Sequence, residues 1–462
     1  MRILHYTLGL PPYRSGGLTK YTNDLMKEQV KNRDDVYLLF PGHLKRNNSK
    51  TIIKRYKVVN GINVYELINP LPVPLLNGIQ NPEAFMKATD YALYREFLNL
   101  NKIEIINLHT LMGLHKEFLI AAKELNIPIV YTTHDYFGLC PRVNFLDSNS
   151  IICEERNSNK CSNCNLKADS LKKIRILQSK EYRVMKNLGI ISKIKMLNSY
   201  VKFDKGLDDI GENIVLTKYN AQSSNYELLL KYYEEMFTLV DRFIFNSTIT
   251  KKIYSKYINA ATKGDIVSIT HQDIRDNRQK KYLNSYKLRL TYLGPDKPYK
   301  GFNLLITAMK RLKELGYSNI SLNVYGNTSC IGQIEENIKI NGKYVYSDLE
   351  KIFKETDLLI VPSRCYETFG FITLEAISYG VPVLLTDKVG SKDILKGNFN
   401  KGIIIQDSSE DIVKTLVTLY EDKSLIENIN HNILNDEFDI ILSQHYQEIN
   451  NIYNRILKEK IS

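Results

Sequence analysis

The sequence has no apolar run long enough to cross a membrane. A transmembrane helix needs roughly 20 consecutive apolar residues, and no hydrophobic stretch of this 462-residue chain approaches that length. The opening segment from Met1 to Leu10 is too short for a signal peptide and lacks its flanks. We therefore expect a cytoplasmic protein, with peripheral contact at the inner face of the plasma membrane left open.

Repeats and nucleic-acid motifs are also missing. The chain shows no repeat of fixed period and no long low-complexity tract. Its formal net charge is +12, yet no zinc-finger, helix-turn-helix or RNA-binding aromatic signature accompanies that charge. We therefore expect no nucleic-acid partner, and anionic lipid or a phosphorylated substrate remains to explain the charge.

Length and hydrophobic pattern predict a two-domain α/β protein. With 43% hydrophobic and 25% charged residues the composition is that of a globular protein, and 462 residues exceed what one hydrophobic core usually supports. Short apolar segments alternate with helical periodicity, which is the pattern of doubly wound parallel sheets. The predicted strands cover residues 2–6, 36–40, 103–109, 127–133, 242–246, 288–293, 321–325, 357–361 and 381–386.

A polar junction at residues 272–287 separates the two halves of the chain. We expect Rossmann-like domains at residues 1–280 and 281–439, with an insertion at about 138–235 in the first. Their ligand would lie in the cleft between them, outside the carboxyl ends of the strands.

The segment 362–382 carries the strongest functional signal. A predicted buried strand precedes it, and a helix is expected to begin near Gly370. The first backbone N–H groups of a helix have no intrahelical partner, so they can hold an anion or a polyol. Glu367 lies before the helix and Glu375 about one turn inside it, so the two carboxylates can hold different parts of one extended ligand. The alternative is a surface helix with solvated glutamates that ends at Gly380.

This segment resembles the donor-site signature of the retaining, GT-B-fold glycosyltransferases of family 4, a large family that includes sucrose synthases and bacterial mannosyltransferases. The resemblance implies an α/β GT-B fold in which two Rossmann-like domains face an interdomain cleft. It implies that Glu367 contacts the donor sugar as a catalytic residue and that Glu375 binds the ribose hydroxyls. The backbone near the sugar and diphosphate would be that of Phe369, Gly370 and Phe371.

Two glycine segments are similar to the same family. Gly16 and Gly17 follow the first predicted strand and match a loop near the donor phosphates and the acceptor. Gly294 opens a segment that resembles the phosphate-binding loop of the second domain. Glycine pairs are common in ordinary turns, so this match is weak by itself. The family fold also implies that a final helix, at 440–462, crosses back to the first domain.

In the second-domain loop, Lys300 takes the position of the family's phosphate-binding lysine. Pro295 stands where the family normally has an arginine, and this departure removes one cation that would neutralise the diphosphate. Lys297 and Arg364 are the alternatives for its replacement.

Histidine is rare, with eight residues in the chain, and two of them follow predicted strands at the cleft. His134 matches the family position beside the reacting sugar, and a hydrogen-bonded histidine at the edge of a core is the alternative. We expect His109 to be structural and Asp135 to orient His134 or the acceptor.

Four of the six cysteines occur within 25 positions, with the spacing C-x12-C-x7-C-x2-C. In a cytosolic protein this clustering favours a structural zinc site, and free thiols or disulfides remain as alternatives. Such a site would fix a polar loop on the acceptor side of the cleft, while catalysis itself would need no cofactor. The four residues are Cys140, Cys153, Cys161 and Cys164.

The positive charge gathers between Lys167 and Lys205, where apolar residues recur at helical spacing. A basic amphipathic helix of this kind can lie on an anionic membrane. A charged helix packed on its own domain is the alternative.

Together these features predict transfer of a sugar from a UDP- or GDP-linked donor to a sugar or lipid-linked acceptor, with retention of anomeric configuration. The expected setting is the assembly of a bacterial surface polysaccharide or glycoconjugate. Two alternatives remain: a nucleotide-sugar epimerase or hydrolase of the same fold, and a non-catalytic nucleotide-sugar-binding protein, which the missing arginine would permit.

Overall fold

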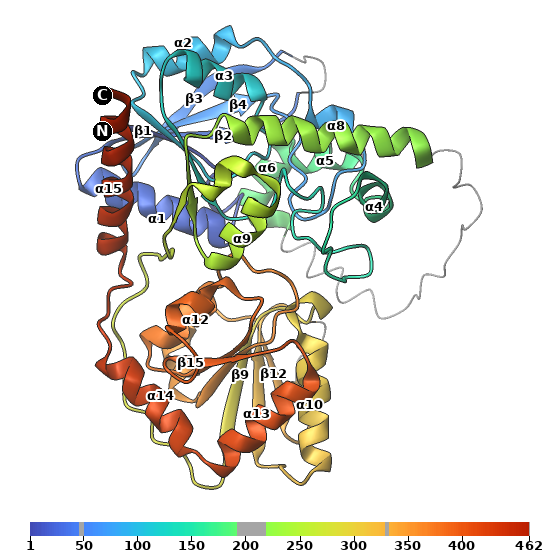
Figure 1. The fold of residues 1–462 in the computed structure, drawn as a ribbon, viewed down its shortest axis with the longest axis vertical. Helices are drawn as coiled ribbons and strands as arrows, with labels where there is room; N and C mark the ends of the chain where they lie inside the picture. Colours follow the sequence, from blue (N-terminus) through green and yellow to red (C-terminus); the bar gives the residue numbers. More distant parts are fainter. Residues whose placement is uncertain (46–49, 192–218, 329–331, 462) are drawn as a thin grey trace.

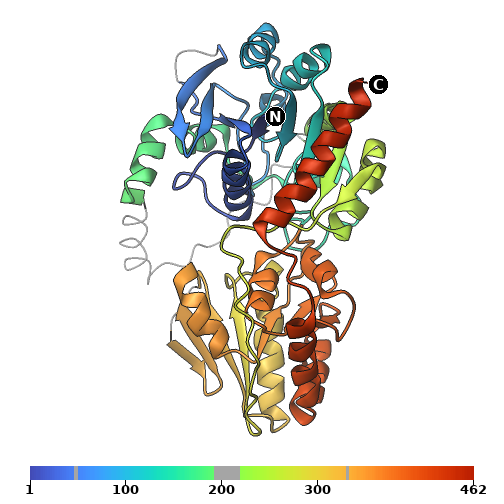
Figure 2. The same ribbon diagram turned by 90° about the vertical axis from the view of Figure 1, so that its left-hand side faces the viewer.

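The computed structural model describes residues 1–45, 50–191, 219–328 and 332–461. The chain forms two α/β domains, which lie one above the other in Figure 1. Each domain has a largely parallel sheet surrounded by helices. Both ends of the chain lie on the first domain, as Figures 1 and 2 show.

The first sheet has eight strands within the described residues. Neighbouring strands run parallel, except for an antiparallel hairpin at one edge. The order across the sheet is β3 (Ile52–Val59), β4 (Ile62–Ile68), β2 (Asp35–Pro41), β1 (Arg2–Tyr6), β5 (Ile105–Leu108), β6 (Ile129–Thr133), β7 (Arg242–Phe245) and β8 (Gly264–Ile266). Every residue of β5 and β6 is buried, as expected for a parallel sheet that is covered on both faces.

Helices of the first domain begin at polar caps in several places. Ser170 and Ser179 each accept a hydrogen bond from a backbone N–H three residues on, and Ser247 forms a capping box. The elements are α1 (Gly17–Lys31), η1 (Pro82–Phe85), α2 (Ala92–Leu100), α3 (Lys116–Glu124), α4 (Ser158–Cys164), α5 (Leu171–Leu177), α6 (Lys180–Asn187), α8 (Tyr219–Thr238), α9 (Thr248–Tyr257) and η2 (Asn259–Thr262).

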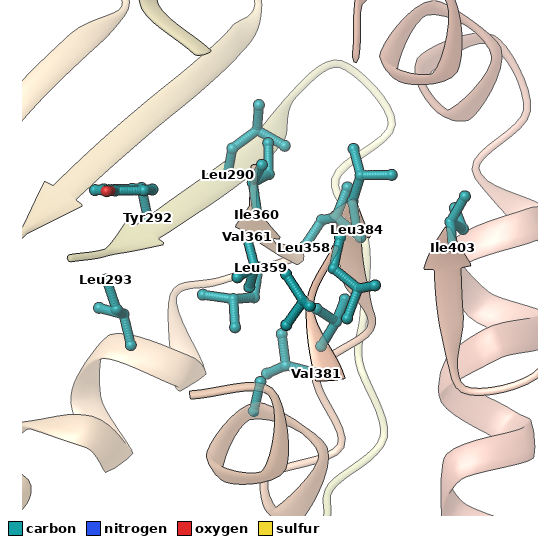
Figure 3. Packing of buried hydrophobic residues seen from close by; sticks show 14 of the residues in the cluster. Leu290, Tyr292, Leu293, Leu358, Leu359, Ile360, Val361, Val381, Leu384 and Ile403 are labelled. Carbon is teal, nitrogen blue, oxygen red and sulfur yellow. The ribbon is translucent and has the colours of Figure 1, made fainter. Parts of the chain in front are cut away.

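The second sheet has seven strands in the described part of the chain, with an antiparallel hairpin at its edge. Their order is β11 (Gly332–Glu335), β12 (Ile338–Gly342), β10 (Ile320–Tyr325), β9 (Leu288–Leu293), β13 (Leu358–Val361), β14 (Val383–Thr386) and β15 (Gly402–Ile405). Side chains such as Leu290, Leu359 and Leu384 belong to one buried cluster across the central strands (Figure 3). This core supports the loops that follow β9 and β13.

The second domain contains short and long helices. They are η3 (Pro298–Lys300), α10 (Phe302–Glu314), η4 (Tyr346–Asp348), α11 (Leu349–Lys354), α12 (Phe371–Ser378), η5 (Gly390–Leu395), α13 (Ser409–Glu421) and α14 (Ser424–Asn435). The last helix, α15 (Leu442–Ile461), lies along the first domain in both ribbon views. Its residues Ile449 and Ile452 pack in one cluster with Ile3 and Ile105 of the first sheet.

The predicted fold class is confirmed, because both sheets are largely parallel and strands alternate with helices. The basic segment differs from the expected pattern in its described part. It forms two short helices, α5 and α6, because Gln178 ends the first and Ser179 caps the second. The remainder of that predicted helix, which includes Lys193, Lys195 and Lys202, lies outside the described residues.

Candidate active site

Helix α12 begins where the sequence predicts a helix. Strand β13 ends at Val361, and α12 starts at Phe371 with Gly370 as its N-cap. Gly370 has a φ of 106°, a left-handed conformation that favours glycine. The first backbone N–H groups of α12 have no intrahelical acceptor, so this helix start can receive an anion or a sugar hydroxyl.

The structure brings two of the predicted donor residues into one ion pair. Lys300 Nζ lies 2.9 Å from Glu367 Oε1. Gly301 follows with a φ of 73°, and a Cβ there would lie 1.6 Å from the carbonyl oxygen of Pro362. Glycine alone permits this approach, which places Lys300 against the loop after β13. Burial opposes the charge on Lys300, but the Glu367 carboxylate outweighs it, and the pKa of Lys300 is raised.

Glu375 is buried in α12 and makes two polar contacts. It accepts a hydrogen bond from the Tyr346 hydroxyl, and its Oε1 lies 3.5 Å from His271 Nε2. The Tyr346 hydroxyl also hydrogen bonds His271 Nε2 at 2.9 Å. Burial raises the pKa of Tyr346, and the Glu375 carboxylate raises it further. Sequence analysis missed both partners; the position of His271 shortly after β8 is a signal that could have found it.

The loop after β9 comes close to the end of β10. A Cβ on Gly326 would lie 2.0 Å from the carbonyl oxygen of Gly294, so the two backbones are in direct contact. At the position of the missing arginine, the carbonyl oxygen of Pro295 accepts a hydrogen bond from Tyr292 at 2.8 Å. Pro295 therefore contributes to the shape of the loop and brings no cation.

The two alternatives for that cation flank Lys300. The backbone N–H of Arg364 donates to the carbonyl oxygen of Tyr299 at 2.9 Å, and its guanidinium lies 3.8 Å from Asp407. Lys297 caps η3, and its carbonyl oxygen accepts from the N–H of Lys300 at 3.0 Å. Both cations therefore lie near Lys300. That one of them supplies the positive charge missing at Pro295 stays a prediction.

The first domain contacts the same loop from the opposite side. A Cβ on Gly17 would lie 3.3 Å from the ring of Phe371, which follows Gly370 at the helix start. Gly16, the N-cap of α1, has a φ of 113°. The hydroxyl of Thr368 donates a hydrogen bond to the carbonyl oxygen of His134 at 3.1 Å. The loop that carries Glu367 therefore meets the predicted glycine turn and His134 at the domain interface.

His134 is a neutral histidine in a cluster of rings. Burial, and to a smaller extent the nearby His445, lowers the pKa of His134 to about 3. Its Nε2 hydrogen bonds Nδ1 of His109 at 3.1 Å. The ring of Tyr21 lies over it, with centroids 4.8 Å apart, and the Tyr21 hydroxyl hydrogen bonds Nε2 of His445 at 2.8 Å.

Asp135 makes its hydrogen bonds elsewhere. Its carboxylate accepts from the Thr110 hydroxyl at 3.1 Å and from the Phe137 N–H at 2.9 Å. Burial raises the pKa of Asp135 to about 6, although both hydrogen bonds act to lower it. These contacts stabilise the turn after β6. Among the described residues, the ring nitrogen of His134 hydrogen bonds to His109 and not to Asp135.

The four clustered cysteines lie on the insertion of the first domain. Burial, and to a smaller extent the nearby Cys140, Cys153 and Cys164, raises the pKa of Cys161 to about 12. None of the four forms a disulfide. Among the described residues, no three His, Cys, Asp or Glu side chains are arranged so that they could hold a metal ion. The thiols as placed do not fit a zinc site, and zinc stays a prediction from the sequence.

A buried ion cluster holds α6 on the first sheet. Arg183 Nη1 donates to Glu66 Oε1 at 2.7 Å, and Nη2 donates to Oε2 at 3.3 Å. His43 Nδ1 lies 2.9 Å from the same Oε1. Burial raises the pKa of Glu66, but hydrogen bonds from Arg183 and His43 outweigh it, and the net pKa is lowered.

A cavity of about 1920 Å³ opens between α5, α6, α2 and the loop after β2. Ile176 of α5 lines it and is 56% exposed, while Val184 of α6 and Leu188, the residue after α6, are 48% and 67% exposed. No helix in the described ranges is long and apolar enough to span a membrane. The cavity is lined by more basic than acidic side chains: Lys45, Lys50, Lys87, Lys172, Arg175 and Lys180 against Asp90, Glu96 and Glu181.

Two Rossmann-like domains whose strand-end loops meet at one site define the GT-B glycosyltransferase fold. The family model described as "Glycosyltransferase Family 4" matches residues 15–152. A second model, described as "Glycosyl transferases group 1", matches residues 273–436. Together they match more than half of the chain, and the chain belongs to the GT-B-fold glycosyltransferases of family 4. The family predicted from the sequence is confirmed.

Curated relatives match parts of the chain. An uncharacterized glycosyltransferase of Methanocaldococcus jannaschii is 30% identical over 134 residues, which cover 27% of this chain and 32% of that protein. The capsular polysaccharide biosynthesis glycosyltransferase CapM of Staphylococcus aureus is 28% identical over 177 residues, 36% of this chain and 46% of that protein. The matches thus span less than half the length of these two relatives.

A solved structure matches the whole chain. Anabaena HepE in complex with UDP has a TM-score of 0.56 and 12% sequence identity, and the match covers 98% of this chain and 100% of that chain. At this identity the likeness shows the GT-B fold, with both domains present.

Proposed function

We propose that this protein transfers a sugar from a nucleotide-diphosphate sugar, UDP- or GDP-linked, to an acceptor hydroxyl with retention of anomeric configuration. The observation that carries the proposal is the loop between β13 and α12. It holds Glu367 against Lys300, leads into the open helix start at Gly370 and touches His134 of the other domain. The structure of Anabaena HepE with UDP-glucose adds support, since that protein shares the fold.

In this proposal Lys300 and the first amides of α12 hold the diphosphate, and Glu375 holds the ribose. Because Lys300 pairs with Glu367, an arriving diphosphate competes with that carboxylate for the ammonium group. Glu367 is then available to the sugar hydroxyls. Positive charge placed where the leaving diphosphate develops negative charge lowers the barrier for its departure.

The chemical step exchanges one bond for another at the anomeric carbon. The bond to the diphosphate oxygen breaks with oxocarbenium-like character, and the acceptor oxygen bonds to the same face. The acceptor proton passes to the departing phosphate oxygen. Attack on the face that the diphosphate leaves gives retention.

For the acceptor we propose a lipid-linked or sugar substrate of bacterial surface polysaccharide or glycoconjugate assembly, handled at an anionic membrane surface. The basic side chains around the α5–α6 cavity suit a phosphorylated group, and the exposed apolar residues beside it suit the lipid interface. The capsular role of the Staphylococcus aureus relative supports this setting.

The test uses Glu367→Ala in the full-length protein. Screening nucleotide sugars by thermal stabilisation first identifies the donor, since a bound ligand raises the melting temperature. We expect Glu367→Ala to keep nucleotide binding and to lose transfer, while Glu437→Ala, which alters an exposed glutamate, behaves as wild type. Wild-type transfer by Glu367→Ala refutes the assignment, and turnover of donor without acceptor indicates a hydrolase or epimerase.

A further inference from the structure

Two buried histidines of the first domain, His5 and His109, and the partly buried His134 form a hydrogen-bonded chain that the proposed chemistry does not explain. His5 Nδ1 lies 2.9 Å from His109 Nε2, and His109 Nδ1 lies 3.1 Å from His134 Nε2. At the far end, His5 Nε2 lies 2.7 Å from Oε1 of Gln29, a buried residue of α1. The chain therefore runs from α1 through the core to His134 at the domain interface.

The sheet itself sets this spacing. His5 is in β1, His109 follows β5 and His134 follows β6, and these three parallel strands are neighbours. The rings of His5 and His109 are tilted by only 12°, with centroids 5.2 Å apart. Nearly coplanar rings at this separation, with nitrogens 2.9 Å apart, have the geometry of an in-plane N–H···N bond.

All three rings are neutral at physiological pH. Burial lowers the pKa of His5 to about 4 and that of His134 to about 3, and it lowers the pKa of His109 as well. A neutral imidazole has one N–H donor and one acceptor nitrogen. A chain of such rings therefore has only two arrangements, with all the N–H bonds pointing one way or all the other.

The amide of Gln29 selects one of them. Its oxygen faces His5 and can only accept, so His5 carries its proton on Nε2. Burial raises the pKa of Tyr453, and side-chain hydrogen bonds with Asn107 and Gln29 act to lower it. With the Gln29 oxygen on His5, the amide nitrogen is the atom that remains to donate to this hydroxyl. Asn107 donates to the same hydroxyl at 2.6 Å. The Gln29 oxygen is the atom that faces His5, at 2.7 Å.

We propose that Gln29, through His5 and His109, is a positioning residue that fixes the tautomer of His134. His5 Nδ1 accepts from His109 Nε2–H, and His109 Nδ1 accepts from His134 Nε2–H. His134 then keeps a lone pair on Nδ1. Within the described residues Nδ1 of His134 has no hydrogen-bond partner, so it can accept a bond from a substrate hydroxyl at the domain interface. That last step rests on the function proposed above.

The experiment is heteronuclear NMR of the full-length protein labelled with 15N-histidine, at neutral pH and without substrate. We expect His5, His109 and His134 each to carry the proton on Nε2. We expect Gln29→Leu, which removes the terminal acceptor, to shift His134 toward a mixture of tautomers, although Gln29 does not touch that ring. Gln29→Glu, which keeps an oxygen acceptor, should restore the wild-type pattern.

Met26→Ala is the matched control, because Met26 is also buried on α1 and belongs to a separate apolar cluster. It should destabilise the protein without changing the tautomer of His134. In transfer assays, Gln29→Leu should lower kcat/KM by about two- to tenfold, the worth of one ordinary hydrogen bond. A proton on Nδ1 of His134 in the wild type, or a tautomer unchanged by Gln29→Leu, overturns the proposal. A proton on Nδ1 in the wild-type spectrum overturns the proposal even where a variant fails to fold, and this test does not depend on the protein being a transferase.

Discussion

Replacing Gly301 with alanine tests whether a backbone contact places Lys300. Gly301 has a φ of 73°, and a Cβ there would lie 1.6 Å from the carbonyl oxygen of Pro362. Ordinary van der Waals contact begins at 3.4 Å, so alanine must separate η3 from the loop after β13. That loop leads to Glu367, the ion-pair partner of Lys300.

Two effects add in this variant. A left-handed backbone costs alanine about 1–2 kcal/mol, and relief of an overlap in packed surroundings costs about 1–3 kcal/mol more. We therefore expect Gly301→Ala to lower the free energy of unfolding by about 2–5 kcal/mol. Gly316 is the matched control, because its φ is 90° but no atom lies within 4 Å of its Cβ position. Gly316→Ala should lower the free energy of unfolding only by the backbone cost of about 1–2 kcal/mol.

The first assay is urea unfolding of both variants. The second is sugar transfer without urea, at a temperature at which both variants are folded. A displacement of about 1 Å in a charged group at the reacting centre can cost about 100-fold in rate. We expect a loss of that order for Gly301→Ala and near wild-type transfer for Gly316→Ala. If the two variants unfold at the same urea concentration and transfer sugar equally well, the backbone contact does not place Lys300.

Three further predictions concern the first domain. Glu66 has a lowered pKa, so its ion cluster stabilises the fold above the unfolded pKa of about 4.3, and this contribution is lost as pH falls through the folded pKa. Glu66→Gln should thus lower the urea midpoint at pH 7, and a gap to wild type that stays constant below pH 4 would contradict this. Vesicles containing anionic lipid should sediment the protein more than neutral vesicles do, and Lys172→Glu with Arg175→Glu should weaken the effect; equal binding to both vesicles excludes charge recognition. If the sequence prediction of zinc is right, protein purified without chelators contains about one zinc per chain and Cys161→Ser loses it, whereas metal-free wild type eliminates that site.

Strands buried on both faces could be predicted well from the sequence. The limits of β1 and β9 are as expected, and nearly all residues of both strands are buried. The edge strand β3 was missed, since Lys54, Arg55 and Lys57 are exposed and interrupt the apolar pattern. It pairs antiparallel with β4 across the two-residue turn Asn60-Gly61, in which both residues have positive φ. Asn-Gly between two strands is a hairpin signal, so this turn could have revealed the strand although its apolar pattern does not.

Some residues of the candidate site could likewise be predicted from the sequence, and others could not. Glu367, Glu375 and Lys300 could be found because they lie in contiguous motifs. Tyr346 and His271 contact Glu375 from segments 29 and 104 positions away, and neither lies in a sequence motif; the only local signal is that His271 follows shortly after β8. Hydrogen-bond partners of this kind depend on the tertiary fold, so their identity requires coordinates.

The domain interface and the donor loop share their hydrogen bonds, which links the position of the domains to the state of the site. Ser247 of the first domain donates to the carbonyl oxygen of Thr368 at 2.7 Å, and the Thr368 hydroxyl donates to the carbonyl oxygen of His134 at 3.1 Å. Separating the domains would break both bonds and would remove His134 from the loop that carries Glu367. A ligand that contacts both sides therefore favours the closed arrangement by the difference between its affinities for the closed and open forms. For this reason a donor bound to the second domain alone should stabilise the protein without ordering the first domain. Donor and acceptor together should stabilise both domains.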